Sequence, residues 1–331
     1  MNMLRVSVVI SVQNRSAMLL DCLRGLAAQT LARDQFEVVV IDNCSTQDLS
    51  PVIEQARQTW SLQIQTARTS QDRGPAPARN LGVQMAKGAI IAFTDSDCRP
   101  VPEWLARGLV AFDDPAVALV SGPVLPKPEQ TASFTAKLSF VTVTEHPTFP
   151  TANLMVKREA FLAQGGFDIS LSFRDPLNRA TECADTDLAW RVIKAGHQRR
   201  FIPEAVMHHE LEEQGLLLWL LEPTRLFLLP ELVRRHPELR QSLLTAGLFF
   251  YPRGFLLYLS LMLCAAVLLW KPELLWALPI GILLRGLIRT KSLNPLMLLR
   301  FCARAPLHVL KLMVMNLALL YGSVRFRSLV L

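Results

Sequence analysis

The feature that most constrains the fold is an alternation of short apolar runs with helical patterns over the first hundred residues. Strands are predicted at residues 6–12, 36–41, 62–66 and 89–93, and most of these runs are nearly continuous in apolar residues. After the first strand, Leu19, Cys22, Leu23 and Leu26 recur at the spacing of an amphipathic helix. Buried strands that alternate with helices predict an α/β fold with a doubly wound, mostly parallel sheet covered on both faces.

Acidic residues follow two of these predicted strands. Asp42 and Asn43 come after the second strand, and Asp95 and Asp97 come after the fourth. In open α/β sheets the ligand binds beyond the carboxyl ends of the strands, so we expect a binding site at that edge. Asp42 is suited to accept hydrogen bonds from a nucleotide base or ribose, and its alternative role is to cap a turn or helix.

The segment Asp95-Ser96-Asp97 is a D-x-D sequence in the turn after a strand. Two carboxylates at this spacing can bind one hard divalent cation, which keeps open positions for phosphate oxygens. The alternative is an ordinary Asx turn. Arg79 opens a helix after the run GPAP, where a cation and a helix N-terminus could both face a diphosphate. The alternative is that Arg79 is a surface residue.

Further candidates lie between residues 180 and 210. Residues 185–195 form a predicted helix whose first turn carries Asp185 and Asp187. Asp187 and Arg191 are spaced as an i,i+4 ion pair, so we expect a structural role for Asp187. Asp185 remains as a candidate general base, although acids also stabilise helix starts. His209 follows a strand and is a candidate metal ligand, with a capping or core role as the alternative.

The composition changes after about residue 210. Residues 1–210 contain 21 Lys and Arg against 22 Asp and Glu, whereas the remaining residues contain 14 against 6. Apolar runs occur at residues 255–270, 274–288 and 305–321, and the third carries His308 and Lys311 on one face. Because this part is both oily and basic, we expect it to associate with a membrane. The expected division is a catalytic domain at 1–210, amphipathic linker helices at 211–250 and hydrophobic helices at 251–331.

The first two apolar runs are short for perpendicular membrane spans, and they are expected to form a helical hairpin. The third run is expected to lie along the membrane interface with Lys311 towards the headgroups. The competing interpretation is a buried, soluble helical domain. The N-terminus shows no signal peptide, and the six cysteines have no metal-binding spacing, so the catalytic domain is expected in the cytosol.

Several blocks of the sequence, in order, resemble glycosyltransferase family 2. They include VSVVISVQNR, EVVVIDNCSTQD, GPAPARNLGVQMAKGAIIAFTDSDCRPVPEWL, TANLMVKREAFLAQGGFD and ADTDLAWRVIKAGH, within residues 4–210. The resemblance implies an inverting enzyme of GT-A fold. It also implies that Asp42 contacts the nucleotide base, that Asp95 faces the nucleotide-sugar and that Asp97 is a metal ligand. By the same correspondence Asp185 is the catalytic base, and His209 lies near the metal and diphosphate.

The sequence departs from the family pattern at three points. Ser11 and Gln13 stand where Pro and Tyr are frequent, and Ala184 stands where Glu usually precedes the base. The Q-x-x-R-W block of processive polysaccharide synthases is absent, which favours transfer of a single sugar. The replacement at Ala184 is expected to affect acceptor binding or to weaken the enzyme.

We therefore expect a transferase that moves a sugar from a UDP- or GDP-sugar to a lipid-linked or envelope-glycan acceptor. The site would bind Mn²⁺ or Mg²⁺ and would contain Asp42, Asn43, Arg79, Asp95, Asp97, Asp185 and His209. The expected location is the cytosolic face of the inner membrane, with lipids as partners and no nucleic acid. The alternatives are a nucleotidyltransferase on a similar sheet and a non-catalytic, membrane-tethered protein that binds nucleotide-sugars.

Overall fold

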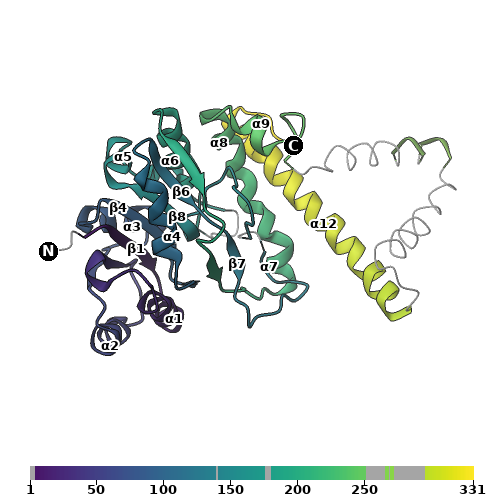
Figure 1. Ribbon diagram of the computed structural model, residues 1–331. Coiled ribbons are helices and arrows are strands. Elements are labelled where there is room, and N and C mark those ends of the chain that lie inside the picture. The colour runs from purple at the N-terminus through teal and green to yellow at the C-terminus, as the bar shows by residue number, and fades with distance from the viewer. Residues whose placement is uncertain (1–3, 139–140, 176–179, 251–264, 268, 272–294) are drawn as a thin grey trace. The chain divides into compact units, whose positions relative to one another are not determined.

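The computed structural model describes residues 4–138, 141–175, 180–250, 265–267, 269–271 and 295–331. It contains two compact units, Met1–Gln214 and Gly215–Leu331 (Figure 1). Each unit has its own helices and its own internal contacts, so they are described separately. The boundaries expected at residues 210 and 250 stay predictions.

The first unit is built on a seven-stranded sheet with the order β11-β6-β8-β4-β1-β2-β3. Strand β8 is antiparallel to its neighbours β4 and β6, and the other neighbouring pairs are parallel. The predicted α/β, mostly parallel sheet is therefore confirmed. The strands are β1 (Val6–Val12), β2 (Phe36–Asp42), β3 (Ile64–Arg68), β4 (Ile90–Asp95), β6 (Val117–Ser121), β8 (Leu154–Lys157) and β11 (Gln198–Phe201).

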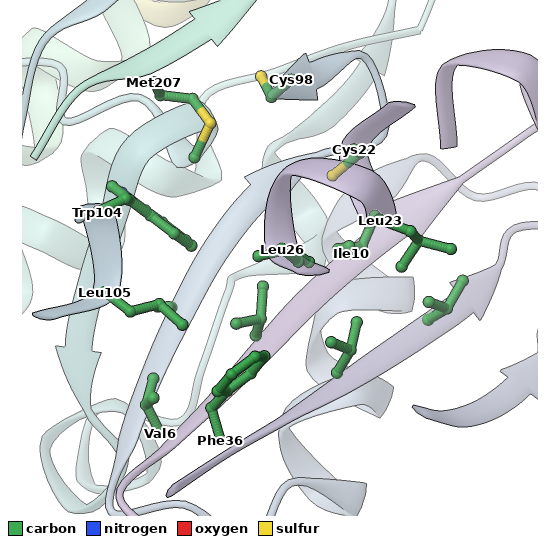
Figure 2. Packing of buried hydrophobic residues seen from close by; sticks show 14 of the residues in the cluster. Val6, Ile10, Cys22, Leu23, Leu26, Phe36, Cys98, Trp104, Leu105 and Met207 are labelled. Carbon is green, nitrogen blue, oxygen red and sulfur yellow. The ribbon is translucent and has the colours of Figure 1, made fainter. Parts of the chain in front are cut away.

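One face of this sheet packs against three helices, α1 (Ser16–Ala27), α2 (Ser50–Trp60) and α4 (Trp104–Val110). Alternate residues of β1, including Val6 and Ile10, point to this face, because side chains of a strand alternate between its two sides. Figure 2 shows Leu23 and Leu26 of α1 beside Ile10, with Trp104 and Leu105 of α4 in the same apolar layer. The predicted helical spacing in α1 is the spacing of its buried residues.

The opposite face packs against α3 (Pro75–Met85) and α5 (Arg158–Ala163), and α6 (Ala184–Lys194) contacts β6. Gly82 of α3 lies directly over Val9, where a Cβ atom would come within 2.5 Å of the valine Cγ1. Phe93 of β4 packs against Phe161 and Phe167, with ring centroids 5.6 and 5.0 Å away. Both faces are thus covered, which explains why the strand sequences are apolar on both sides.

Two small sheets complete the first unit. Strand β12 (Met207–His209) pairs with β5 (Cys98–Pro100) and β7 (Val124–Pro126). Strands β9 (Ser172–Arg174) and β10 (Ala180–Glu182) form an antiparallel pair. Both strands of this pair are short and contain polar residues. The continuous apolar run that marks β1, β2 and β4 is missing from them.

Only part of the segment 151–157 is a strand, although its sequence, TANLMVK, is rich in apolar residues. Residues Thr151–Asn153 form a 3-10 turn, and only Leu154–Lys157 are extended. The turn follows Pro150, and the Asn153 side chain donates to the carbonyl oxygens of Pro123 and Ala205 at 2.9 and 2.7 Å. These side-chain bonds hold a bend where an apolar pattern alone predicts extension.

The second unit contains α7 (Leu216–Leu221), α8 (Leu229–Arg235), α9 (Leu239–Leu243) and the long helix α12 (Pro295–Phe326). Within the described residues, Cys302–Phe326 is one helical stretch that is long and apolar enough to cross a membrane. The predicted hairpin of residues 255–270 and 274–288 lies almost wholly outside the described residues, so it stays a prediction.

Lys311 does not point away from the second unit as sequence analysis expected. Its Nζ atom lies 4.2 Å from the centre of the Trp219 ring and 3.4 Å from Glu222 Oε2. A partly desolvated ammonium gains from both a carboxylate and an aromatic face, and this explains the inward position. Helix α12 also exposes apolar side chains, which include Met313, Leu317 and Val324.

Candidate active site

The loops after β1 and β2 are tied to each other by side-chain hydrogen bonds. The Asn14 Oδ1 atom accepts from the backbone N–H groups of Thr46 and Gln47, at 2.8 and 3.1 Å. Asn14 and Cys44 both have positive φ angles, 53° and 60°, which turn the chain sharply at the carboxyl ends of the strands. These hydrogen bonds hold the two loops together where the nucleotide is expected to bind.

Asp42, the last residue of β2, faces this loop region. Its Oδ1 atom accepts from the backbone N–H of Ser45 at 2.8 Å, and its Oδ2 atom lies 3.6 Å from Arg68 Nη1. The Asn43 side chain is fully engaged, since it donates to Asp72 at 3.2 Å and accepts from Thr69 at 3.1 Å. Asn43 therefore shapes the loop around Asp42.

Four residues with metal-ligating atoms meet beyond β4. Ligand atoms of Asp95, Asp97, Cys98 and His209 all lie within 4.8 Å of one another. Asp95 ends β4, Cys98 begins β5 and His209 ends β12, so the small three-stranded sheet brings the histidine to the D-x-D turn. Figure 2 shows Cys98 and Met207 close together where these two short strands pair. Sequence analysis did not include Cys98 in this group.

One ring nitrogen of His209 faces a carboxylate oxygen of this group. The Nδ1 atom of His209 lies 2.7 Å from the carbonyl oxygen of Glu210, and in a neutral ring this bond places the proton on Nδ1. The lone pair then lies on Nε2, which is 3.5 Å from Asp97 Oδ1. That carboxylate oxygen is buried, and no donor among the described residues reaches it. A lone pair beside an orphaned carboxylate oxygen fits a divalent cation.

Arg15 supplies a positive charge at the same place. Its guanidinium contacts Asp97 Oδ2, on the other oxygen of that carboxylate. Arg15 lies in the short loop between β1 and α1, and its side chain is about half exposed. Sequence analysis missed this residue because a single Arg after a strand has no distinguishing pattern.

Arg79 is buried between two carboxylates, so the alternative of a surface arginine is wrong. Its Nη2 atom donates to Asp95 Oδ1 at 2.7 Å, and its Nη1 atom donates to Glu182 Oε1 at 2.6 Å. Burial opposes the ionisation of Asp95, but the Arg79 guanidinium outweighs it and holds the pKa of Asp95 below its usual value. Arg79 thus joins α3 to both β4 and β10.

Asp185 lies in the first turn of α6. Its Oδ1 atom accepts from the backbone N–H of Thr186 at 2.8 Å. Burial, and after it the negative charge of Glu182, raise the pKa of Asp185 to about 7, although Arg79 and backbone N–H groups oppose both. A carboxylate with a pKa near neutrality can exchange a proton at physiological pH.

Comparison with known proteins agrees with this geometry. The sequence model described as Glycosyl transferase family 2 matches residues 7–170. Residues 7–170 therefore match a family 2 glycosyltransferase domain. The glycosyltransferase AglE of Haloferax volcanii is 29% identical over 220 residues, which cover 64% of this chain and 69% of that protein.

A second relative matches this chain over a smaller part of its own length. The pre-mycofactocin glycosyltransferase of Mycobacterium tuberculosis is 30% identical over 225 residues, which are 63% of this chain but 43% of the relative. The match therefore spans less than half of that protein. The family 2 domain is what the chain shares with it.

Solved structures share the fold of the family 2 domain. The mannosyltransferase PcManGT from Pyrobaculum calidifontis, in complex with GDP-Man and Mn²⁺, has a TM-score of 0.61 at 21% identity and covers 98% of this chain. Residues 1–349 of S. aureus TarS, in complex with UDP, give a TM-score of 0.54 at 17% identity, with 97% of this chain covered. These likenesses confirm the predicted GT-A type of fold.

The structure brings most of the predicted site residues of the family 2 domain to one edge of the sheet. Asp95, Asp97 and His209 form one group, and Arg79 connects it to Glu182 and, electrostatically, to Asp185. Asp42 and Asn43 lie on the loops after β2. Asp187 is paired with Arg191 at 2.8 Å, as its spacing predicted. The roles of these residues stay predictions.

Proposed function

We propose that this chain is an inverting, non-processive glycosyltransferase that uses a UDP- or GDP-sugar as donor. The acceptor is a hydroxyl group of a lipid-linked or envelope-glycan molecule at the cytosolic face of the inner membrane. The observation that carries the proposal is the pairing of a cation site at Asp97 and His209 with a near-neutral base, Asp185, at one edge of the sheet.

On the donor side, Asp42 accepts hydrogen bonds from the nucleotide and Asn43 holds its loop in place. Asp97 and His209 hold Mn²⁺ or Mg²⁺, and Asp95 faces the nucleotide-sugar with its charge balanced by Arg79. The bound cation neutralises negative charge on the diphosphate leaving group. Two structural relatives, one in complex with GDP-Man and Mn²⁺ and the other with UDP, support this choice of ligands.

On the acceptor side, Asp185 takes the proton of the attacking hydroxyl group. The acceptor oxygen then forms a bond to the anomeric carbon while the bond from that carbon to the diphosphate oxygen breaks, which inverts the configuration. Because the pKa of Asp185 is about 7, the group is ionised in slightly alkaline solution and is still a stronger base than an ordinary aspartate. Burial of the carboxylate thus serves the reaction.

Helix α12 supports the proposed membrane location. Leu310, Met313, Leu317 and Val324 are exposed on it at helical spacing, with exposed fractions from 46% to 81%. An apolar stripe of this kind is unfavourable in water and is stabilised in contact with lipid. The acceptor of an enzyme held at a membrane is then itself expected to be membrane-bound.

The test is a product assay on the purified, detergent-solubilised full chain with a panel of nucleotide-sugars. Release of UDP or GDP together with a glycosylated product supports the proposal. Release of pyrophosphate from a nucleoside triphosphate would instead support a nucleotidyltransferase. Thermal stabilisation by a nucleotide-sugar without any turnover would support the non-catalytic alternative, for which Ala184 is the sequence argument.

A further inference from the structure

We propose that Glu182 is a positioning residue that links the donor side of the site to the catalytic base by clamping Arg79 and the start of α3. The inference rests on the proposed function, because it assigns a role within the same reaction. It concerns a residue that was not among the site residues expected from the sequence.

The clamp consists of three hydrogen bonds. Glu182 Oε1 accepts from Arg79 Nη1 at 2.6 Å, and Glu182 Oε2 accepts from the backbone N–H of Ala76 at 3.1 Å. Arg79 Nη2 reaches Asp95 Oδ1 at 2.7 Å. One guanidinium therefore bridges a carboxylate on β4 and a carboxylate on β10, and the second oxygen of Glu182 holds the first turn of α3.

The hydrogen bonds of the clamp are largely buried, so the loss of one partner is costly. The Arg79 side chain is 6% exposed and the Glu182 side chain is 16% exposed, so neither can exchange its partner for bulk water. Removing one member of a buried ion pair leaves the other charged and unpaired, and this costs more than the pair itself contributes. Loss of Glu182 would also leave the Ala76 N–H without its acceptor at a helix start, where no intrahelical bond can replace it.

The same contacts argue that Glu182 is not the base itself. Both of its oxygens already accept hydrogen bonds, one of them from a guanidinium. Asp185 instead accepts from the uncharged backbone N–H groups of Thr186 and Thr151. The charge of Glu182 acts on Asp185 from β10, just before α6, whereas Ala184 contributes no charge. Glu182 thus supplies a carboxylate near the base although the residue directly before the base has none.

Charged groups from three elements surround Asp185 in this arrangement. They are Glu182 on β10, Arg79 on α3 and, beyond the arginine, Asp95 on β4, while Asp187 on the same helix is paired with Arg191. The negative charge of Glu182 raises the pKa of Asp185, and Arg79 lowers it. Neutralising Glu182 should therefore lower the pKa of Asp185 and weaken it as a base.

The experiment compares the native full chain with Glu182→Gln, Glu182→Ala and the control Glu159→Gln. Gln retains one acceptor oxygen but no charge, and Glu159 is an exposed glutamate on α5. For Glu182→Gln we expect kcat to fall about tenfold to a hundredfold, the range typical of positioning groups, with a smaller change in donor Kd. The acid limb of the kcat/KM profile should move to lower pH. Glu182→Ala should lose more activity, and the control should match the native enzyme.

A merely structural role would lower Tm and the folded fraction of Glu182→Gln without moving the acid limb. Native kcat in folded Glu182→Gln, or an unmoved acid limb, would overturn the inference while leaving the proposed function intact. Absence of transfer by the native chain would overturn both. If Glu182→Ala fails to fold, Glu182→Gln alone still decides between these outcomes.

Discussion

The Nε2 atom of His209 lies 3.5 Å from the Oδ1 atom of Asp97, although the two residues come from different strands and distant parts of the chain. The pairing of β12 with β5 produces this approach, because His209 is aligned with Cys98, the residue after Asp97. The register of a three-residue strand thus determines whether the D-x-D turn has an imidazole beside it.

The cation prediction concerns Asp97→Asn. The substitution keeps the size of the side chain but removes its charge, so affinities for Mn²⁺ and for the nucleotide should fall together. Titration calorimetry with each ligand measures both affinities. Chelation of the native enzyme should abolish transfer, and added Mn²⁺ or Mg²⁺ should restore it.

Asp34→Asn is the matched control, because Asp34 is an exposed acid outside the site. It should bind metal and nucleotide as the native chain does. Full transfer activity in excess chelator would remove the cation from the mechanism.

The base prediction concerns Asp185→Asn. An asparagine oxygen can still accept from the Thr186 N–H, so the helix start should be preserved while proton transfer is lost. We expect a fall in kcat of about a hundredfold to ten-thousandfold with nearly native nucleotide binding. Steady-state kinetics and nucleotide titration measure these quantities. Turnover close to the native rate would show that Asp185 is not the base.

The same variant should change the pH dependence of stability. The pKa of Asp185 is raised to about 7 in the folded protein, against an ordinary aspartate value of 3.8. The folded state binds the proton more tightly, so the native chain should lose stability as pH rises between these two values. Asp185→Asn should not lose stability in this way. The Tm of the variant minus the Tm of the native chain should therefore increase from pH 4 to pH 8. An unchanged difference in Tm across this range would contradict the raised pKa.

The packing prediction concerns Gly82→Ala in α3. The new Cβ atom would lie 2.5 Å from Val9 Cγ1 and 3.3 Å from Ile41 Cγ1. Overpacking costs about 1 to 3 kcal/mol, and the better helix propensity of alanine offsets at most about 1 kcal/mol. The midpoint of urea unfolding should therefore fall, and activity should fall with it, because α3 also carries Arg79. Gly215→Ala, which adds a Cβ atom in open space, should leave both unchanged.

The membrane prediction concerns Leu317→Glu on the exposed apolar stripe of α12. Leu317 is 66% exposed, and a carboxylate there should weaken contact with lipid and shift protein from the membrane to the soluble fraction. Val110→Glu is the control, since Val110 is similarly exposed at 65% but lies in the first unit. Reporter fusions at residue 331 should place the C-terminus in the cytosol. Recovery of the native chain without detergent in the soluble fraction would rule out membrane residence.

The sheet was predictable because its strands are buried on both faces. Burial leaves a continuous apolar signal in β1, β2 and β4, and the parallel order follows from the intervening helices. The short strands β5, β7 and β12 were not predictable in the same way. Each has three residues, and their pairing depends on contacts between segments far apart in the chain.

The site residues were predictable where they come at the end of a strand with a clear apolar pattern, as with Asp42, Asp95 and Asp97. The partners of those residues were not. Glu182 lies in a polar segment without periodicity, and only the tertiary structure brings it to Arg79. The contacts of Lys311 were also not predicted. The sequence shows which residues share a face of the helix, but it does not show which other residues cover that face.

The seven-stranded sheet has two halves that come from different parts of the chain. Strands β1 to β4 come first in the sequence, and β6, β8 and β11 come later. Asp42, Arg79 and Asp95 come from the half formed by β1, β2, β3 and β4, whereas Asp185 and His209 come from residues after β8. Exchange of the later segment between related chains is therefore expected to transfer the proposed base, Asp185. The transferred His209 would also have to fit the D-x-D turn of the earlier segment, because the proposed cation site draws on both segments.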